Sequence, residues 1–512
     1  MRVLIRSDAS PTIGSGHIAR LLPLARTLRK QGSHVAFACR RLPGNRLDAL
    51  AAEGFETFAL ADFYPGEDPL QAIESMLPWQ ADIDALAQAL EGYPPFDWIV
   101  VDHYGLDHHW QAAARRWAPR IAAVDDLATR AYSVDLLLNQ NLSGTAQAYE
   151  SLLKPPLTSP LSLGERVGVR GLFGPHYAML REEFNGCPAI EIKPRAKRVL
   201  VNFGGFDAAM QTHHAMRALA GFDDLEVDFV AGADNPAWQR MQVLAAGRPN
   251  WRLHSFVSDL QRMMTEADLF VGAGGGTSWE RAAMGLPTIC IAVSNNQQAN
   301  GEAMATAGAH VYLGAREEVS VEQLRQAVGF VADNQGIRQS LADRSRQLVD
   351  GRGAQRVAAA LAGAVLHMRA ATAQDAQLLF EGRNAEAVRR WSLETGVVEW
   401  SSHERWLAAS LSNPQRLLLI AEADDGPVGV VRYDLRGVDA EVSIYLFEGR
   451  FGLGWGRALL ARGEACVIAR WPHLEAITAQ VLPANEASLK VFRAAGFTQR
   501  ACAFTRVLKD QQ

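Results

Sequence analysis

The segment 272–287, GAGGGTSWERAAMGLP, joins a glycine run to hydroxyl-bearing residues at the start of a helical pattern, and the apolar DLFV precedes it. A loop that leads from a strand into a helix presents backbone N–H groups and the positive end of the helix dipole, which suit phosphate. We therefore predict a diphosphate site. The residues assigned to it are Gly275, Gly276, Thr277 and Ser278, with both hydroxyls able to cap the helix or donate to phosphate, and Glu280 for ribose hydroxyls. The alternative is a glycine-rich turn with an ordinary cap.

The segment 13–20, IGSGHIAR, follows the first apolar run. Gly14 and Gly16 allow a tight turn at the start of a helix and place His17 near its N-terminus, where the helix dipole disfavours the charged imidazolium. A neutral imidazole can act as a general base toward water. A lone histidine is more often a capping or packing residue, but the position at a strand end, opposite a phosphate loop, favours the catalytic interpretation.

A third glycine segment, FGLGWGRALL at 451–460, also joins a strand to a helix. Alternate glycines expose consecutive backbone amides, which again suits a pyrophosphate. The residues predicted to bind a cofactor there are Gly452, Gly454, Gly456, Arg457 and, from the following PANEASLKVF segment, Asn485.

Two regions of alternating strands and helices must position the first two sites. The expected buried strands of the first region are 3–5, 35–39, 98–102 and 122–126, with a helix at 19–32. Those of the second are 198–205, 225–232, 251–257, 268–276 and 287–293. Such alternation is typical of doubly wound α/β lobes, and the pattern predicts lobes over 1–190 and 196–366. The Pro-, Ser- and Gly-rich stretch 155–171 is predicted to be a mobile surface insertion.

The pattern restarts at 367–380 with a short strand and a helix. Residues 417–435 predict two antiparallel strands joined by an Asp-Gly turn, and residues 442–447 predict another strand before the third glycine segment. A smaller α+β domain is therefore expected over 368–508.

Composition excludes several classes of protein. The 512 residues are 48% hydrophobic and 21% charged, with a net charge of −5, so neither nucleic acid nor an anionic membrane is an expected partner. No apolar run approaches the roughly 20 residues that cross a bilayer, and the N-terminus lacks a signal-peptide pattern; a soluble, cytoplasmic protein is expected. The five scattered cysteines predict buried thiols rather than a disulfide framework or a zinc site.

Six ordered motifs carry a resemblance to a family: IGSGHIAR, VDHYGLD at 101–107, VDDLATRAYSVDLLLNQN at 124–141, GPHYAMLREEF at 174–184, FGGFD at 203–207, and the 272–287 segment. They resemble the UDP-sugar hydrolases of bacterial pseudaminic acid synthesis, which are similar in fold to two-lobed GT-B glycosyltransferases. The resemblance implies metal-independent, inverting hydrolysis of UDP-2,4-diacetamido-2,4,6-trideoxy-β-L-altropyranose to UDP and free sugar, with His17 as the motif histidine.

Other polar residues carry weaker hypotheses. Asp102 and Tyr104 end a predicted strand and are expected to line the sugar pocket. Asn296 and Gln297 follow another strand and could reach acetamido groups, or serve only as turn residues. Asp125 and Asp126 end another predicted strand, where they could either contact the substrate or cap a helix. His103, His108 and His109 could suggest a metal site, but the carboxylates near them lack a repeated ligand spacing, and no metal is expected.

Residues 451–460 and 483–497 together resemble the acetyl-CoA-binding core of GNAT acetyltransferases. The family's Gln/Arg position is Phe451, with Arg450 one step earlier, and its frequent general-acid tyrosine is Phe492. Tyr445 is therefore the candidate acid and Glu441 the candidate base. GRNAEAVRRWS at 382–392 and HERW at 403–406 resemble the amino-sugar N-acetyltransferase of the same pathway, although that family's tryptophan is Gly382 here.

The resemblances imply a bifunctional chain. Its acetyltransferase domain would acetylate the 4-amino group of the precursor UDP-sugar and its hydrolase would use the product, with other enzymes of the pathway as possible partners. Two alternatives stay open: a GT-B glycosyltransferase that transfers the sugar to an acceptor, and a C-terminal domain that binds CoA only for regulation.

Overall fold

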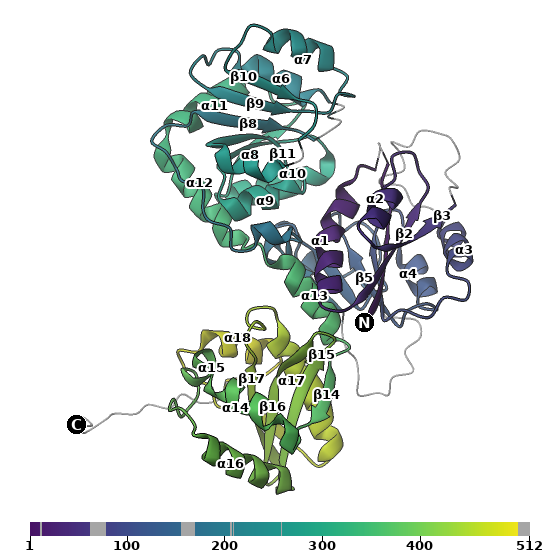
Figure 1. Cartoon of the computed structure of the whole chain (residues 1–512). Helices are drawn as coiled ribbons and strands as arrows, with labels where there is room; N and C mark the ends of the chain where they lie inside the picture. The colour runs from purple at the N-terminus through teal and green to yellow at the C-terminus, as the bar shows by residue number, and fades with distance from the viewer. Residues whose placement is uncertain are drawn as a thin grey trace, which may run out of the picture. The chain divides into compact units, whose positions relative to one another are not determined.

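The structure, a computed structural model, describes residues 1–10, 13–61, 78–154, 169–204, 207, 209–257 and 259–499 (Figure 1). The chain forms two compact units, Met1–Ala358 and Ala359–Gln512. The first unit contains two parallel sheets and the second contains one mixed sheet. The predicted fold class, two doubly wound lobes followed by an α+β domain, is confirmed.

The first sheet has seven strands in the order β3-β2-β1-β4-β5-β6-β7, and every pairing is parallel. Its strands are β1 (Arg2–Ser7), β2 (His34–Arg40), β3 (Glu56–Leu60), β4 (Trp98–Asp102), β5 (Arg120–Val124), β6 (Leu136–Asn139) and β7 (Arg170–Phe173). The helices between them are α1 (Gly16–Lys30), α2 (Leu47–Ala52), α3 (Trp79–Ala89), α4 (His108–Ala114) and α5 (Ala146–Tyr149). Strands such as β4 are buried along their whole length, as expected for a parallel sheet covered on both faces.

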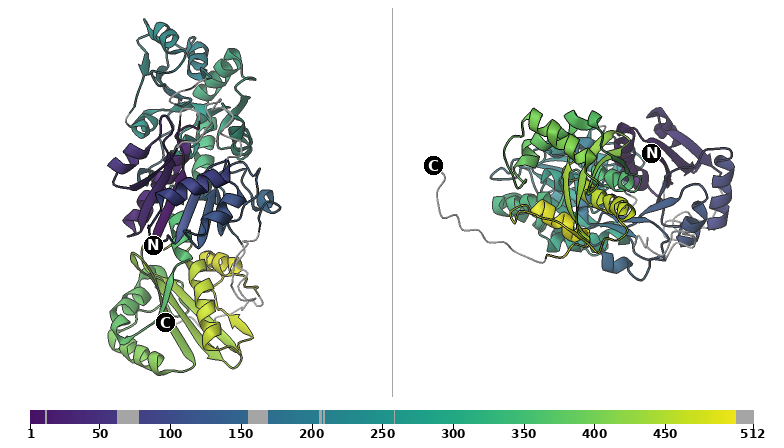
Figure 2. Two further views of the ribbon diagram at one scale, coloured as in Figure 1. Left: turned by 90° about the vertical axis from the view of Figure 1, so that its right-hand side faces the viewer. Right: turned by 90° about the horizontal axis from the view of Figure 1, so that it is seen from below.

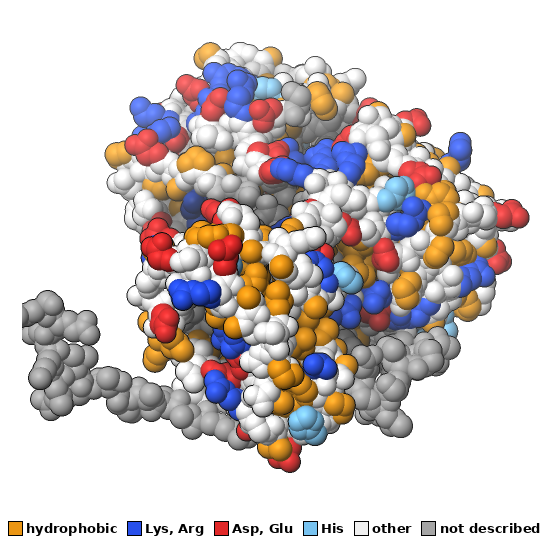
Figure 3. Space-filling view, turned by 60° about the horizontal axis from the view of Figure 1, so that its bottom comes forward, with side chains coloured by type: hydrophobic (Ala, Val, Ile, Leu, Met, Phe, Trp, Pro, Cys, Tyr) orange, Lys and Arg blue, Asp and Glu red, His pale blue; other side chains and the backbone are white. Residues whose placement is uncertain are grey.

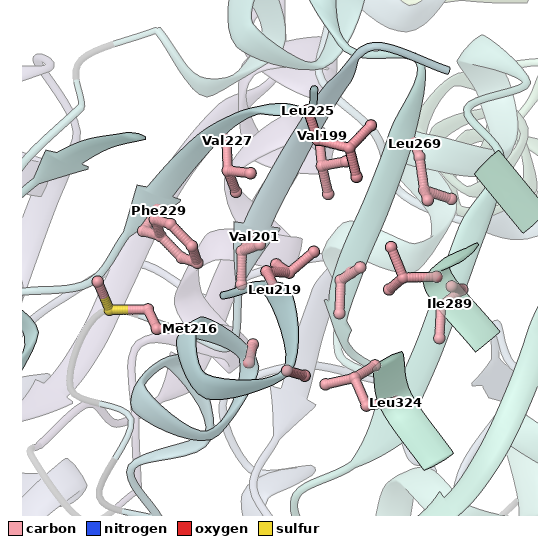
Figure 4. Close-up of a cluster of buried hydrophobic side chains, with 14 of the residues drawn as sticks. Val199, Val201, Met216, Leu219, Leu225, Val227, Phe229, Leu269, Ile289 and Leu324 are labelled. Atoms are coloured by element: carbon pink, nitrogen blue, oxygen red, sulfur yellow. The ribbon is translucent and has the colours of Figure 1, made fainter. Parts of the chain in front are cut away.

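The second sheet has six parallel strands in the order β10-β9-β8-β11-β12-β13. Its strands are β8 (Arg198–Asn202), β9 (Glu226–Val230), β10 (Trp251–His254), β11 (Leu269–Ala273), β12 (Thr288–Ala292) and β13 (Val311–Ala315). Its helices are α6 (Gln211–Leu219), α7 (Trp238–Ala245), α8 (Leu260–Glu266), α9 (Thr277–Met284), α10 (Asn295–Thr306), α11 (Val321–Asp333), α12 (Gln335–Leu348) and α13 (Gly353–Gly363). Figure 4 shows one face of this sheet, where Val199, Val201 and Phe229 pack against Met216 and Leu219 of α6.

The third sheet, in the second unit, has the order β14-β15-β16-β17-β18. Its strands are β14 (His367–Ala370), β15 (Arg416–Ala423), β16 (Gly426–Arg436), β17 (Asp439–Leu446) and β18 (Ala476–Thr478). Its α-helices are α14 (Ala376–Asn384), α15 (Glu386–Arg389), α16 (Trp400–Ser412), α17 (Trp455–Arg470) and α18 (Glu486–Ala494). Both faces of the sheet are covered (Figure 2), because Val431 packs in the core with residues of α17 whereas Val430 packs with residues of α14 and α16.

The sequence predicted the long alternation but missed β3, β6, β7 and β13, which are short or only partly buried. Residues 155–168 of the predicted insertion lie outside the described part of the chain. Its last two residues, Arg170 and Gly171, belong to β7 and pair with β6. The boundary between the two units falls inside α13, because Ala359 and Leu366 both pack in the core of the second unit.

Among the described residues, no helix is long and apolar enough to span a membrane. On the face in Figure 3, basic and acidic side chains are interspersed. The four described cysteines are free thiols; Cys39 and Cys290 are buried, whereas Cys187 and Cys466 are partly exposed. The fifth, Cys502, lies outside the described residues.

A buried cluster of charges lies at the carboxyl end of β1 and β2. Asp82 of α3 forms an ion pair at 2.6 Å with Arg6, also pairs with Arg40, and accepts a 2.8 Å hydrogen bond from Trp110. Burial alone would raise the pKa of Asp82, but the charges of Arg6 and Arg40 outweigh it and lower that pKa. Asp82 is therefore ionised, and the cluster needs its charge.

Asp82→Ala should lower the free energy of unfolding by about 3–5 kcal/mol, since it leaves two buried arginines short of a partner. Asp84, in the same helix but exposed, provides the matched control. Asp84→Ala should change stability by no more than about 0.5 kcal/mol. Urea unfolding of the full chain measures both values. Equal stabilities for the two variants would show that the cluster does not contribute as argued.

Candidate functional site

Both parallel sheets have a switch point, where the strand order reverses and the chain leaves two neighbouring strands toward opposite faces of the sheet. In the first sheet it lies between β1 and β4, and in the second between β8 and β11. Ligands of open α/β sheets bind outside the carboxyl ends of the strands at such points. The segment with His17 follows β1, Asp102 ends β4, and the 272–280 loop follows β11. The topology thus places both predicted sites of the first unit at switch points.

His17, the second residue of α1, points its Nδ1 at the carboxylate of Asp102, 2.6 Å away. Arg20, one turn later, holds the same carboxylate through Nε at 2.6 Å and Nη2 at 2.7 Å. Burial alone would raise the pKa of Asp102, but the charge of Arg20 outweighs it and keeps that pKa well below its usual range. An ionised carboxylate only accepts, so Nδ1 carries the proton in this short contact. The lone pair of His17 is then on Nε2.

A second carboxylate completes this arrangement. Tyr104 lies edge-on to the His17 ring with centroids 4.6 Å apart, and its hydroxyl donates to Asp126 at 2.6 Å. Asp126 also pairs with Arg20 and accepts from Asn141 at 2.9 Å. Asp102 has no exposed surface and Tyr104 is 7% exposed. Both residues therefore lie against His17 with little exposed surface, and their predicted contact with the sugar stays a prediction.

The adjacent Asp125 does not cap a helix. Its carboxylate accepts from the backbone N–H of Leu127 and Ala128, and from the hydroxyl of Tyr149 at 2.8 Å. It stabilises the turn that follows β5, and this turn presents Asp126.

The glycines of the 272–280 loop differ in their surroundings. A Cβ on Gly272 would lie 2.0 Å from the carbonyl oxygen of Asn202, so this glycine allows β11 to pack beside β8. A Cβ on Gly275 would have its nearest neighbour at 3.7 Å, and one on Gly276 would meet nothing within 4 Å. The backbone of Gly275 and Gly276 is therefore open to a ligand.

Helix α9 begins at Thr277 with Gly276 as its N-cap and no capping bond from a side chain. The predicted capping by Thr277 and Ser278 is not observed. Their hydroxyl oxygens instead accept hydrogen bonds from Arg281, at 2.9 and 3.0 Å. The amides of Ser278 and Trp279 donate to the carbonyls of Gly275 and Gly276, at 2.9 and 3.3 Å, so an anion would be bound by the amides that precede them in the loop.

Two further predicted residues act on turns. Gln297 Oε1 accepts from the backbone N–H of Gly274 at 3.2 Å and of Val293 at 3.1 Å, which joins the glycine loop to the start of α10. Asn296 accepts from the hydroxyl of Ser294 at 2.6 Å. Both contacts are those of turn residues, one of the two roles predicted for Asn296 and Gln297. Gln297 in addition holds the glycine loop through Gly274.

Glu280 lies in the first turn of α9 and pairs with Arg181 at 3.4 Å. Burial raises the pKa of its carboxyl, and the charge of Arg181 opposes that shift only in part. Arg181 is on the segment that connects the two lobes, so the contact links that segment to the loop.

A run of contacts connects the histidine site with the glycine loop. Asn141 donates to Asp126, and the next residue, Leu142, donates its backbone N–H to Asn300 at 2.9 Å. Asn300 is buried on α10, the helix that also carries Gln297. The two predicted sites are therefore held by one continuous set of contacts within the first unit.

The three histidines considered for metal binding separate into two groups. His103 lies 3.2 Å from the buried Asp8, whereas Asp107, His108 and His109 place one potential ligand atom each within 4.8 Å of one another. Asp107 is also the N-cap of α4 and accepts from the backbone of His109. Its carboxylate thus has a structural role in that turn.

In the second unit, β17 and β18 separate after a short parallel pairing of 439–441 with 476–478, while β17 continues to Leu446. The glycine loop follows, with positive φ at Gly452 and Gly454. Gly454 is the N-cap of α17, which has no capping bond from a side chain, and Arg457 is exposed in its first turn. The start of a helix without a side-chain cap, beside a strand end that pairs with β16 but no longer with β18, suits a pyrophosphate with an extended chain.

Gly456 and Asn485 have structural roles in this site. A Cβ on Gly456 would lie 3.2 Å from Val491, so its small size allows α17 to pack on α18. Asn485 caps α18 by accepting from Ser488 at 3.1 Å. Arg450 does not replace the missing Gln/Arg side chain of the loop, because it forms a two-point ion pair with Asp425.

The candidate acid and base of the second unit both lie on β17. Tyr445 donates to the carbonyl of Leu379 at 3.4 Å, and burial raises its pKa, so the phenol stays protonated at neutral pH. Glu441 is partly exposed, at the last residue that pairs with β18. Gly382 stands where the similar family has a tryptophan. A Cβ on Gly382 would lie 2.9 Å from the Tyr445 ring, so Tyr445 fills part of the space beside this glycine. Phe492 is buried against Phe497.

Residues 366–498 match the acetyltransferase (GNAT) domain family, and residues 205–356 match the glycosyltransferase family 28 C-terminal domain. The chain is also 24% identical over 312 residues to the UDP-2,4-diacetamido-2,4,6-trideoxy-beta-L-altropyranose hydrolase of Campylobacter jejuni. The matched residues are 61% of this chain and 98% of that relative. These matches fit a fusion of a hydrolase-like region with a GNAT domain.

Two other similarities concern the hydrolase-like region. The spore coat polysaccharide biosynthesis protein SpsG of Bacillus subtilis is 27% identical over 192 residues, which are 37% of this chain and 57% of that relative. The crystal structure of MurG from Acinetobacter baumannii is 16% identical with a TM-score of 0.49, over 70% of this chain and 99% of that one. The family 28 match contains the glycine loop, and the GNAT domain match contains the third glycine segment.

Sequence reasoning missed several residues that the structure brings to these sites. Arg20 lies inside the IGSGHIAR motif, one turn after His17, and that spacing could have indicated that both side chains share a face of the helix. Asn141 ends another family motif, but the sequence carried no signal that it would contact Asp126. Arg281 follows Glu280 directly, and its burial could not be read from its type, since arginine is mostly exposed.

Proposed function

We propose that the hydrolase-like region removes UDP from a UDP-linked 2,4-diacetamido-2,4,6-trideoxy sugar, the compound in the name of its Campylobacter jejuni relative. The observation that carries this proposal is His17, whose Nδ1 is held at 2.6 Å by an ionised Asp102 at a switch point of the sheet. Among the described residues, no hydrogen bond to its Nε2 is found. That nitrogen can therefore accept a proton from water.

In the proposed reaction, His17 Nε2 takes a proton from water while the water oxygen bonds to the anomeric carbon. Asp102 stabilises the resulting imidazolium. The bond from the anomeric carbon to the diphosphate oxygen breaks, and its electron pair leaves with UDP. Attack from the face opposite UDP inverts the configuration. In this proposal the step uses no metal, because the backbone amides of Gly275, Gly276 and Thr277 and the positive end of the α9 dipole stabilise the developing charge.

For the second unit, we propose transfer of an acetyl group from acetyl-CoA to the 4-amino group of the precursor UDP-sugar. Acetyl-CoA supplies the thioester. The neutral amine attacks its carbonyl carbon, Glu441 takes the amine proton directly or through water, and Tyr445 protonates the departing thiolate. The products are an amide and free CoA. A fusion would keep the acetylated intermediate near the next active site.

Mass spectrometry of the products tests both proposals on the full chain. A UDP-4-amino sugar with acetyl-CoA should give the acetylated UDP-sugar, then free sugar and UDP; a UDP-diacetamido sugar should give UDP without acetyl-CoA. The family 28 match favours a second candidate, transfer of the sugar to an acceptor other than water. UDP release that requires an added acceptor would support that candidate. Binding of acetyl-CoA without transfer would support a regulatory domain, which the buried Phe492 also allows.

Acetyl transfer should increase with pH until the amine of the sugar is deprotonated, because only the neutral amine attacks. The raised pKa of Tyr445 keeps its phenol protonated over this range, so its titration should not end the increase near neutral pH. Release of free CoA thiol, measured between pH 6 and 9, gives the profile. Phe492→Tyr is the control and should keep the same profile, with equal or higher activity. A rate independent of pH would contradict rate-limiting attack by the amine.

A further inference from the structure

Arg281 is buried beneath the glycine loop, with 2% of its surface exposed. Its Nη1 donates to the Thr277 hydroxyl at 2.9 Å, and its Nη2 donates to the Ser278 hydroxyl and to the carbonyl of Ala273, each at 3.0 Å. Its guanidinium also lies over the ring of Phe270, 4.2 Å from the centroid. One buried cation thus contacts both ends of the loop.

Among the described residues, no carboxylate lies within 4.0 Å of Arg281. The neighbouring Glu280 pairs instead with Arg181, and the Nε of Arg281 has no hydrogen-bond partner in the described part of the chain. Burial lowers the pKa of Arg281 to about 10, so the side chain is still charged at neutral pH. A cavity of about 10 Å³ beside it is lined by residues that include Ser278 and His310 and contain no acid. The charge of Arg281 therefore has no ion-pair partner in the part of the chain that the structure describes.

The bonding of Arg281 also decides what the two hydroxyls can do. A guanidinium donates and cannot accept, so the oxygens of Thr277 and Ser278 use lone pairs toward it. Their hydrogens are then available for donation to another group. Residues 272–280 contain no lysine or arginine, so Arg281 is the cation next to the loop in the sequence. A buried charge interacts strongly with an anion because the surrounding dielectric is low.

We propose that Arg281 is a positioning residue for the diphosphate: from behind the loop it supplies the countercharge and turns the hydroxyl of Thr277 into a donor toward the ligand. This inference rests on the proposed binding of UDP by the first unit. It places the recognition of phosphate, rather than of the nucleoside, on Arg281.

The test compares the affinities of UDP and uridine by titration calorimetry on the full chain. Arg281→Met should weaken UDP binding by about 10–100-fold, the range of a hydrogen bond to a charged group, and change uridine binding by less than about 3-fold. Arg281→Lys keeps the charge and should recover part of the UDP affinity. Arg338→Met is the matched control, because Arg338 is also fully buried but donates to the carbonyls of Val331 and Pro194. It should leave the ratio of the two affinities unchanged.

Thr277→Val and Thr277→Ser extend the test, since they leave Arg281 in place. Loss of UDP preference in the valine variant and its retention in the serine variant support the proposal. Equal losses for UDP and uridine in Arg281→Met, or a full UDP preference in Thr277→Val, would overturn it. Absence of UDP binding in the unaltered protein would instead refute the proposed function of the first unit.

Discussion

His17→Ala should lower kcat for UDP release by about 10²–10⁴-fold, the usual contribution of a general base. The physical reason is the contact of its Nδ1 with the ionised Asp102, which leaves the lone pair on Nε2 for water. Because the glycine loop is on another lobe, the variant should bind UDP with an affinity within about 3-fold of that of the unaltered protein. A change of that size is expected from small indirect effects. UDP release measured at saturating substrate, with calorimetry of UDP binding, gives both quantities.

Two variants sharpen this test. Asp102→Asn should also lower kcat, because an amide no longer requires the proton of His17 to be on Nδ1. His109→Ala removes an exposed histidine and should leave kcat unchanged. Normal turnover in His17→Ala would exclude His17 as the base, whatever the result for Asp102→Asn.

Gly276→Val should abolish detectable UDP binding. A Cβ at Gly276 meets no protein atom within 4 Å, so the fold can accept the larger side chain, but the branched side chain would occupy the space in which a diphosphate approaches the backbone. Calorimetry with UDP measures the loss. Gly336→Val is the control, since Gly336 is in α12 and also has open space around its Cβ position. Unchanged UDP affinity in Gly276→Val would place the diphosphate elsewhere.

Glu280→Ala should weaken UDP binding by about 1.5–3 kcal/mol if the carboxylate accepts from the ribose hydroxyls, as expected for a hydrogen bond to a charged group. The contact with Arg181 is long, at 3.4 Å, and Glu280 can exchange it for the ribose. Comparison of UDP with its 2′-deoxy analogue checks the assignment. If both nucleotides lose affinity equally in the variant, the carboxylate does not contact the 2′-hydroxyl.

Local features of this protein are determined by its sequence. Glycine runs that follow an apolar strand and precede a helix indicated anion-binding turns at 272–277 and 451–455, and a tight turn that places His17 near a helix N-terminus at 13–17, because backbone freedom and helix dipoles act over a few residues. Strong alternation of apolar runs and helical patterns likewise predicted most of the long strands. Short strands such as β6, with four residues, carry too little periodicity to be distinguished from loops.

The tertiary structure alone decided which of these residues act together. His17 and Asp102 are 85 residues apart, and Arg20 and Asp126 are 106 residues apart; the strand order brings them to one edge of the sheet. Gly276 and Gly456 are alike in sequence, but one faces open space and the other faces Val491. Roles that depend on burial, on a neighbour's charge or on the space around a Cβ atom arise from packing between distant segments, which local sequence patterns do not encode.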